Sequence, residues 1–264
     1  MEYIKIITIN TWKCDGDYRE RMPILAGQLK KLKAEIIACQ ECFHSDEGKA
    51  STLRFLAGEL NMHYSFLPGR FKKRLFEDRW VKSFSGLGIL STYPITAIIE
   101  LELPGMPEDN DRKAQQALIN LPGGEQIFFT NTHLTHTGNK NGLRTLQAEA
   151  LAGFVTKDVS SKYRIICGDF NAVEGSVEIE TFIRMSGAIN CYTAGNGAEP
   201  AYSLAVPYTE NKLICVDHIF SLPIAGGSIY PEFINSGVVL NIQDGTSGLF
   251  PSDHFGISTT LIIN

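Results

Sequence analysis

The chain lacks any long hydrophobic run. Its 264 residues contain no apolar stretch near the ~20 residues that a membrane-spanning helix needs. The first eight residues read as a strand, without the basic region and apolar core of a secretory signal. The sequence also shows no internal repeat, low-complexity segment or linker. These absences argue against a helical membrane protein and a repeat protein. They predict a single domain over residues 1–264, located in the cytoplasm.

Positive charge is also in short supply. Lysine and arginine together number 24, against 29 aspartates and glutamates, so the net charge is −5. A protein that coats nucleic acid without sequence preference needs clustered lysine and arginine. The charge balance therefore argues against that class, although it leaves room for a local basic groove.

Cysteine is sparse and scattered. There are six cysteines, most of them in apolar runs, and only Cys39 and Cys42 form a C-x-x-C pair. No second cysteine or histidine pair follows at zinc-finger spacing. The pattern predicts buried, reduced thiols, as in a cytoplasmic protein, with a redox or zinc role as the alternative.

Strand-like and helical segments alternate along the chain. Residues 3–10 alternate and are rich in β-branched side chains, which is typical of a strand. Apolar residues recur at helical spacing in four segments. The order of these elements predicts two packed sheets with helices on their outer faces. Helices are predicted at residues 18–33, 50–60, 143–156 and 177–185, and further strands at 36–39, 64–67, 86–90, 95–103, 117–121, 126–132, 165–168, 213–220, 236–240 and 254–263.

Polar side chains stand at the ends of several predicted strands. The most informative segment is Cys167-Gly168-Asp169-Phe170-Asn171, where a buried strand ends in glycine, a carboxylate and an amide. Asp169 and Asn171 would face the same side of an extended chain. Asp169 could hold or deprotonate a water, and Asn171 could donate to a phosphate oxygen, whereas an Asx turn is the alternative. Similar strand ends occur at Asn10, Gln40-Glu41, Asn131-Thr132-His133, Asp217-His218 and Asp253-His254. Together they suggest a metal-assisted hydrolytic site.

Oxygen donors among these strand ends suit a divalent metal. Asn10 and Glu41 end the first two predicted strands, which a helix joins, so they can share a ligand. Glu41 supplies the carboxylate that Mg²⁺ prefers, and Asp253 adds a second one. The alternative is that Glu41 caps the next segment and Asn10 makes a turn.

Two histidines could carry acid–base chemistry. A carboxylate such as Asp217 on one nitrogen of His254 would fix its tautomer and favour the imidazolium form. The other nitrogen could then act as general base or contact phosphate. His133 offers a second imidazole, or is merely a hydrogen-bonded histidine at a strand end. His218 follows Asp217 directly, so it should point to the opposite face.

The set as a whole resembles the endonuclease/exonuclease/phosphatase family. That family includes pancreatic-type deoxyribonucleases, apurinic endonucleases, neutral sphingomyelinases and inositol polyphosphate 5-phosphatases. The resemblance extends from Thr8 to about Gly256. It is carried by residues 8–12, Gln40-Glu41, residues 85–91, Asn131-Thr132-His133-Leu134, residues 168–172, residues 216–219 and Ser252-Asp253-His254.

The resemblance implies a four-layered α/β (α+β) sandwich of two mostly antiparallel sheets, and Mg²⁺-dependent hydrolysis of phosphoester bonds, with Mn²⁺ possible. The substrate would be a nucleic acid, a phospholipid head group or a small phosphoester, and no obligate protein partner is implied. The alternative is a catalytically silent module that binds a phosphate ligand. By motif, Asn10 and Glu41 would sit at the metal, with Asp253 nearby. Asp169 and Asn171 would orient water and phosphate. His254, paired with Asp217, would act as general base or phosphate contact, and His133 would assist the pentacovalent state or the leaving group.

The sequence also departs from the family pattern and leaves the substrate open. Lys13 follows Trp12, where relatives often have Asn. Arg112 and Arg144 are candidate phosphate contacts, although Arg144 could simply be a surface residue. Residues 70–84 hold six lysines and arginines interleaved with four aromatic residues. This segment could flank the site as a loop and bind a phosphate backbone or an anionic membrane. Otherwise it is a solvated loop or short helix.

Overall fold

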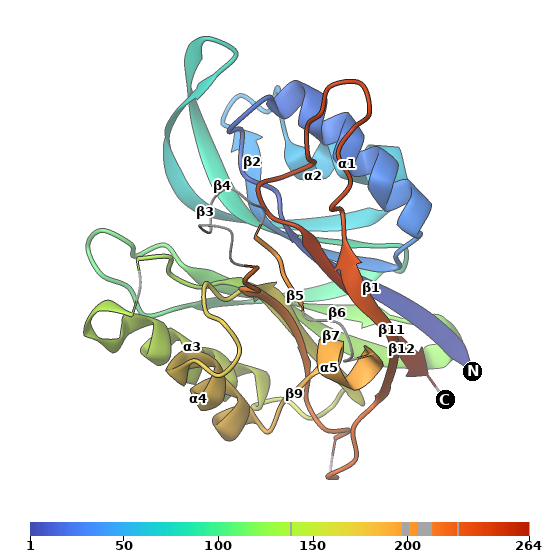
Figure 1. Cartoon of the computed structure of the whole chain (residues 1–264). Coiled ribbons are helices and arrows are strands. Elements are labelled where there is room, and N and C mark those ends of the chain that lie inside the picture. Colours follow the sequence, from blue (N-terminus) through green and yellow to red (C-terminus); the bar gives the residue numbers. More distant parts are fainter. Residues whose placement is uncertain (138, 197–200, 205–212, 226, 264) are drawn as a thin grey trace.

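Two six-stranded sheets pack face to face in the computed structural model, which describes residues 1–137, 139–196, 201–204, 213–225 and 227–263 (Figure 1). Neighbouring strands are antiparallel except for two parallel pairs, β1–β2 and β7–β8. The first sheet has the order β11 (Glu232–Val239), β12 (Gly256–Ile263), β1 (Glu2–Asn10), β2 (Ile36–Ser45), β4 (Arg79–Ser91) and β3 (His63–Phe76). The second has the order β5 (Ile95–Glu102), β6 (Lys113–Asn120), β7 (Gln126–His133), β8 (Tyr163–Asp169), β10 (Asp217–Ser221) and β9 (Ile189–Asn190).

Helices cover the outer face of each sheet, as the periodicity predicts. α1 (Tyr18–Leu32) and α2 (Thr52–Leu60) lie over the first sheet, and α3 (Leu143–Val155) and α4 (Val177–Ser186) lie over the second (Figure 1). A short helix, α5 (Cys191–Asn196), packs on β11. Two 3₁₀ turns span Pro122–Gly124 and Lys140–Gly142. Four layers result, which confirms the predicted sandwich. Among the described residues, the helices are all too short or too polar to cross a membrane.

The strand period of two sorts apolar side chains into separate cores. On β1, Ile4 and Ile6 face the second sheet, whereas Ile7 and Ile9 face α1 and α2. The inner layer is built from isoleucine, alanine and phenylalanine of both sheets, and β-branched residues pack well on such surfaces. A third cluster lies under α3 and α4. Burial of this apolar surface is the main stabilising contribution to the sandwich.

The two parallel pairs determine where the chain presents its polar strand ends. Each pair is a strand–helix–strand unit, β1–α1–β2 and β7–α3–β8, so both strands of a pair end at the same edge. The register places Asn10 beside Gln40, and His133 beside Asp169. β10 then begins at that edge, because its first residue, Asp217, pairs with Asp169. Residues far apart in sequence therefore meet along one edge of the sandwich.

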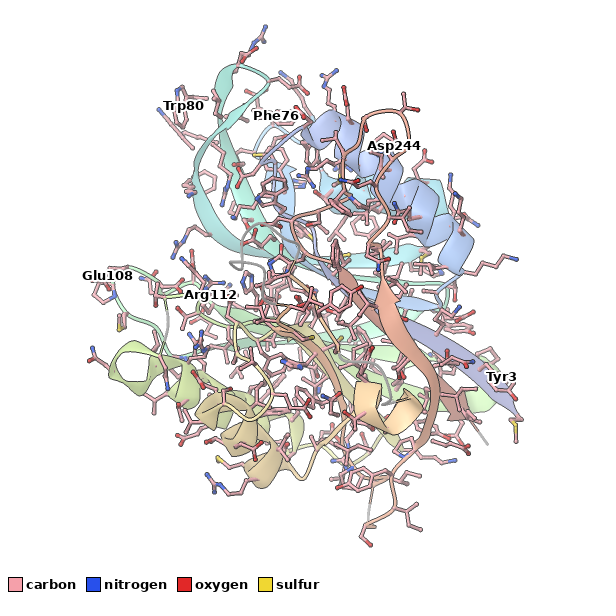
Figure 2. All side chains as sticks on the ribbon, in the orientation of Figure 1. Tyr3, Phe76, Trp80, Glu108, Arg112 and Asp244 are labelled. Carbon is pink, nitrogen blue, oxygen red and sulfur yellow. The ribbon has the colours of Figure 1, made fainter. Side chains whose placement is uncertain are left out.

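Residues 70–84 form a β-hairpin, which corrects the expectation of a loop or short helix. β3 and β4 pair through this segment, and the chain reverses at Glu77 and Asp78, which both have positive φ. Two positive φ values are typical of the two-residue hairpin turn, which usually contains Asn or Gly. The sequence lacks that signal here. The hairpin extends beyond the rest of the sheet, and Trp80 projects from it with 72% of its surface exposed (Figure 2).

Smaller differences concern strand ends. β2 does not stop at Gln40-Glu41 but continues to Ser45 through a bulge between Cys39 and Cys42. β10 begins at Asp217, four residues later than the predicted start. The sequence did not predict α5 or β9, which are both short. All six cysteines are free and five of them are buried, as expected for reduced thiols.

Gly168 must be glycine because β7 passes too close for a side chain. Its φ is 146°, and a Cβ placed on it would lie 2.0 Å from the carbonyl oxygen of Thr132. We expect Gly168→Ala to lower the free energy of unfolding by about 3 kcal/mol, since the parallel pair must separate to make room. Urea denaturation measures the change.

Gly153→Ala is the matched control for this substitution. Gly153 lies in α3, and a Cβ added there meets nothing within 4 Å. Alanine at this position should raise the free energy of unfolding by roughly 0.5–1 kcal/mol. Equal effects of the two substitutions would show that the tight strand contact is not what requires glycine at residue 168.

Candidate active site

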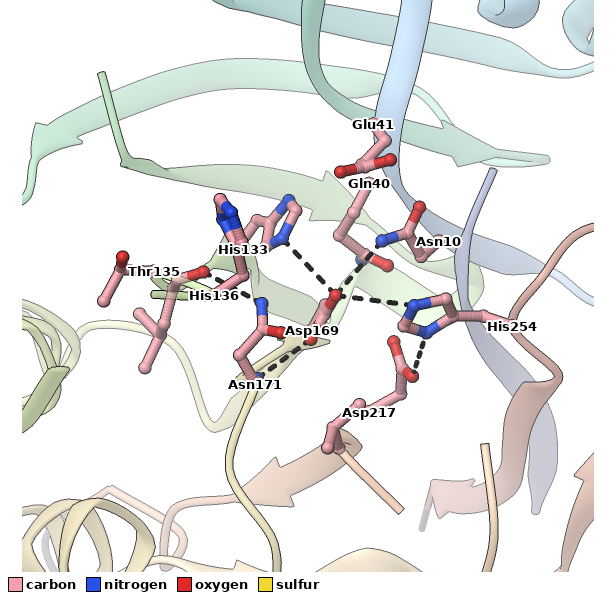
Figure 3. Close-up of polar contacts among 12 residues, drawn as sticks. Asn10, Gln40, Glu41, His133, Thr135, His136, Asp169, Asn171, Asp217 and His254 are labelled. Atoms are coloured by element: carbon pink, nitrogen blue, oxygen red, sulfur yellow. Dashed lines mark hydrogen bonds and ion pairs between the residues drawn. The ribbon is translucent and has the colours of Figure 1, made fainter. Parts of the chain in front are cut away.

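Asp169, the last residue of β8, is the centre of a polar cluster at the edge of the sandwich where the strand ends meet. Its Oδ2 accepts a hydrogen bond of 3.1 Å from Asn10 Nδ2 and lies 3.4 Å from His133 Nε2 and 4.0 Å from His254 Nε2 (Figure 3). Its Oδ1 accepts a hydrogen bond of 2.9 Å from the backbone of Asn171. The carboxylate is 98% buried, so the donors from Asn10 and Asn171, with the two nearby imidazoles, replace its hydration.

His254 is held by Asp217 on the side away from Asp169. Its Nδ1 lies 2.7 Å from Asp217 Oδ2, which leaves Nε2 facing Asp169. Burial lowers the pKa of His254, but the charge and hydrogen bond of Asp217, with Asp169 and Asp253, outweigh burial and raise it to about 10. His254 is therefore an imidazolium at neutral pH, with an N–H directed into the cluster.

Burial shifts Asp169 and His133 toward their neutral forms. It raises the pKa of Asp169 to about 7, helped by the nearby charge of Asp217 and opposed by His254 and Asn10. It also lowers the pKa of His133 well below 6.5, and the cations Arg112, His254 and Lys13 add to this effect. The edge thus holds two imidazoles in different states, one charged and one neutral. Such divergent pKa values are typical of functional sites.

Glu41 reaches the edge because the chain bulges there. It has a φ of 54°, at the register shift between Cys39 and Cys42, and this conformation sets its direction. Glu41 Oε2 lies 2.9 Å from Lys13 Nζ. Burial raises the pKa of Asp253, which also experiences the charges of His254, Glu41 and Lys13. Glu41 and Lys13 thus form an ion pair at the edge, and both influence the carboxylate of Asp253 electrostatically.

The carboxylate pair fits a hard divalent cation. Glu41 and Asp253 offer charged oxygens, and Asn10 Oδ1 adds an amide oxygen that accepts a hydrogen bond from Trp12 N. The Lys13 ammonium already lies against Glu41, so the position accepts positive charge. A separate set, Asp169, Asp217 and His254, has potential ligand atoms within 4.8 Å of one another. The hydrogen bond between His254 and Asp217 within that set favours a proton-sharing cluster instead.

The two candidate substrate arginines occupy different surroundings. Arg112 donates to Asp109 at 2.9 Å and lies 2.9 Å from His136 Nδ1, beside the cavity described below. Arg144 lies 2.9 Å from Glu178 Oε1 and donates to the carbonyl of Thr135 at 3.2 Å. The structure thus places Arg144 between α3 and α4, engaged with a buried carboxylate, and not within the Asp169 cluster.

Asn171 lies beside Asp169 but turns its amide toward β7. Its φ is 49°, and Nδ2 donates to the carbonyl of Leu134 at 3.1 Å. Among the residues that the structure describes, the second N–H of that amide and its oxygen have no hydrogen-bond partner, so both can bind a ligand. The Asx turn, which was the alternative for this segment, does form, because the backbone of Asn171 donates to Asp169 Oδ1.

A cavity of about 310 Å³ opens beside the cluster. Glu41, His133 and His136 line one side of it, and the base of the β3–β4 hairpin lines the other. Lys13 also lines the cavity. Asp169, His254 and Asp217 are not part of the lining, so the cluster meets the cavity through His133 and Glu41.

The sequence matches the model of the endonuclease/exonuclease/phosphatase family over residues 7–254. The chain belongs to the endonuclease/exonuclease/phosphatase family.

Solved structures agree with this assignment at the level of the fold. A family protein from Leptotrichia buccalis C-1013-b superposes with a TM-score of 0.76 at 18% identity, covering 98% of this chain and 100% of that one. A humanized D. rerio TDP2 gives 0.76 at 18% identity, covering 99% of both chains. The human Nocturnin catalytic domain with bound sulfate gives 0.73 at 18% identity, covering 99% and 95%. A comparison with curated proteins gives no match.

Lys13 and Arg74 both line the cavity, although neither was among the individual site residues predicted from the sequence. Lys13 was noted only as a departure from the family pattern, and its contact with Glu41 depends on positive φ values at both residues. Arg74 lines the cavity from the hairpin. An alternation test over residues 70–84 would have placed Arg74 on the same face as Lys72.

His218 lies away from the cluster, as expected for the residue after Asp217. Its Nε2 lies 2.8 Å from the carbonyl of Ala172, and its ring stacks on Phe220. Burial lowers its pKa, so the folded protein holds it neutral. A histidine with a depressed pKa stabilises the fold above its unfolded pKa of about 6.5, and that contribution is lost as the pH falls through the folded pKa.

We expect His218→Gln to reduce the loss of stability in acid. Glutamine keeps a donor for Ala172 but cannot gain a proton, so the free energy of unfolding should fall less between pH 7 and pH 5 than in the parent. Urea titrations at a series of pH values measure the slope. His63→Gln, at an exposed strand position, is the control. Identical slopes for the parent and His218→Gln would contradict the buried neutral state.

Proposed function

We propose that the protein is a Mg²⁺-dependent hydrolase of phosphoester bonds, either a phosphodiesterase or a phosphatase. The observation that supports it most is the buried Asp169 carboxylate, which Asn10, His133 and the His254–Asp217 pair surround, next to the carboxylates of Glu41 and Asp253. A group that accepts protons, an imidazolium and a pair of metal-suited carboxylates meet at one edge. Hydrolysis of a phosphoester needs these three kinds of group.

Asp169 orients the attacking water and takes its proton. Its Oδ2 lies 3.4 Å from His133 Nε2 and 4.0 Å from His254 Nε2, and Oδ1 is fixed by the backbone of Asn171. Fixed hydrogen bonds hold the carboxylate in one orientation, so the water that it binds has a defined direction of attack. A pKa of about 7 suits a group that accepts a proton near neutral pH.

His254 contacts the phosphate as a cation, which is one of the two roles that the sequence left open. Asp217 holds Nδ1, so the Nε2 proton is free to donate to a non-bridging oxygen as charge develops. His133 is neutral and lies on the other side of Asp169, where it can donate to the pentacovalent state or to the leaving oxygen. Asn171 adds an amide beside the same position.

Glu41 and Asp253 would hold Mg²⁺, with Asn10 adjacent, and Mn²⁺ offers similar chemistry. A bound divalent ion neutralises phosphate charge and stabilises the leaving oxygen. A metal held by Glu41 would share this carboxylate with Lys13, whose Nζ lies 2.9 Å from Oε2. The substrate class stays open between nucleic acid, a phospholipid head group and a small phosphoester, and the cytoplasmic location stays a prediction from the sequence.

We expect Asp169→Asn to lower kcat by about 10² or more, because the amide cannot accept the proton of water. Hydrolysis of bis-p-nitrophenyl phosphate and p-nitrophenyl phosphate, with Mg²⁺ and with EDTA, measures it. His254→Ala should show a loss of similar size. Asp158→Asn, at an exposed loop residue, is the control.

Melting temperatures separate loss of chemistry from loss of fold in this experiment. A parental kcat in Asp169→Asn would exclude the assigned role. EDTA-resistant turnover by the parent would exclude the metal. A wider panel includes DNA, RNA, sphingomyelin and inositol phosphates. If the intact parent binds phosphate compounds but hydrolyses no member of this panel, the protein is a silent binding module.

We expect Glu41→Gln to raise the Mg²⁺ concentration that gives half-maximal activity, since a neutral amide replaces the charged oxygen. Calorimetric titration with Mn²⁺ should show weaker binding by the same variant, independently of turnover. Glu59→Gln, at an exposed residue of α2, is the matched control. Unchanged metal titrations for Glu41→Gln would show that the ion is held elsewhere.

A further inference from the structure

One face of the β3–β4 hairpin forms a basic wall of the cavity. Side chains alternate between the two faces of a strand. On β3, Arg70, Lys72 and Arg74 line the cavity that also touches His133 and Glu41. Their neighbour Lys73 lines a separate hollow beside α1 and α2, together with Trp80. The hairpin therefore presents three successive cationic positions to the candidate active site.

Carboxylates neutralise only part of this wall. Arg70 lies 2.9 Å from Asp109 and 2.7 Å from Asp111, and Arg112 also pairs with Asp109. Lys72, Arg74 and Lys113 line the same cavity, and none of the three forms an ion pair with an acidic residue in the part of the chain that the structure describes. In a protein with a net charge of −5, three unpaired cations around one cavity indicate an anionic ligand.

Arg74 adds an independent sign of a missing acceptor. The residue is 95% buried, and its Nη1 donates to the backbone and hydroxyl of Ser83 at 2.9 and 3.0 Å. Its Nη2 donates to the carbonyl of Arg70. The Nε has no partner among the described residues, although it is buried. Buried N–H groups without an acceptor are rare in folded proteins. Because Arg74 also lines the cavity, an anion that enters the cavity can compensate the charge of its guanidinium.

The two sides of the cavity differ in chemistry. The cluster side carries Glu41 and His133, where the proposed reaction takes place, and the hairpin side carries the unpaired cations. A single phosphate at the cluster would leave the hairpin side without a counter-charge. A substrate with a second phosphate would satisfy both sides at once, and guanidinium and ammonium groups bind phosphate oxygens well.

We propose that Arg74, Lys72 and Lys113 form a second anion subsite, which holds a further phosphate of the substrate while the scissile phosphate lies at the Asp169 cluster. This inference rests on the proposed function, because it assigns the scissile phosphate to that cluster. The favoured substrates carry at least two phosphates. The second phosphate is either the next one in a nucleic acid strand or another group of a small phosphoester.

Binding of inorganic pyrophosphate tests the subsite without any reaction. We expect calorimetry on the metal-free protein to show binding that weakens about tenfold in Lys72→Gln and in Arg74→Met, as for loss of a charge-assisted hydrogen bond. Lys73→Gln is the matched control, since Lys73 is the next residue but lines the other hollow. Lys113→Gln gives a second test if Arg74→Met fails to fold. Equal affinities of the parent, Lys72→Gln and Lys113→Gln would overturn the subsite.

Hydrolysis then tests the link to the substrate. Two esters are compared: thymidine 5′-(4-nitrophenyl phosphate) with and without a 3′-phosphate. We expect the 3′-phosphate to raise kcat/KM about tenfold in the parent and in Lys73→Gln, and much less in Lys72→Gln. A short oligothymidylate forms the third arm. If Lys72 matters for the oligonucleotide but not for the small ester, the second phosphate belongs to a nucleic acid backbone.

The outcomes separate the two proposals. Weaker pyrophosphate binding in Lys72→Gln, without hydrolysis of any ester by the parent, supports the subsite and contradicts the hydrolase. Hydrolysis of both esters with equal kcat/KM, together with unaltered pyrophosphate binding in Lys72→Gln, supports the hydrolase and overturns the subsite.

Discussion

The arrangement of the polar strand ends depends on the spacing between the two sheets, and a buried amide contact fixes that spacing. Gln40 of β2 donates to Asn131 of β7 at 2.7 Å, and the Asn131 amide donates to the carbonyls of Cys39 and Gly88 at 2.9 and 2.8 Å. Both side chains are fully buried, so the contact has no competition from water. Asn10 and Glu41 come from one sheet and Asp169 from the other. A shift of the sheets would therefore separate the groups that must act together.

The same edge concentrates features that cost stability. Asp169 and Asp217 are carboxylates buried near each other, and His254 supplies one compensating charge. Glu41 and Asn171 also hold positive φ values, which side-chain-bearing residues rarely adopt. The surrounding sandwich has enough packed apolar surface to maintain these conformations. Strain and buried charge at one edge of an otherwise regular fold are typical of a functional site.

Regular periodicity made most of the fold predictable. The period of 3.6 residues identified α1 to α4, because each of these helices buries one face against a large apolar layer. Alternation identified β1, and short apolar runs identified buried strands such as β8. The hairpin of β3 and β4 had no such layer beneath it, and its Glu77-Asp78 turn lacks Gly and Asn. α5 and β9 are too short to show a period. Local patterns cannot reveal elements whose stability comes only from their neighbours.

Residue order alone predicts which side chains end the strands, and hence that oxygen and imidazole groups gather at one edge of a sandwich. It also determined the family, through motifs such as Gly168-Asp169-Phe170-Asn171. How these groups face each other depends on the packed fold. Contacts between segments far apart in the chain produce three features of the site. They are the bulge that directs Glu41 toward Lys13, the burial that separates the pKa values of His133 and His254, and the basic wall of the hairpin. Local sequence sets where a strand ends and which side chains stand there. The electrostatic environment of each side chain depends on everything packed around it.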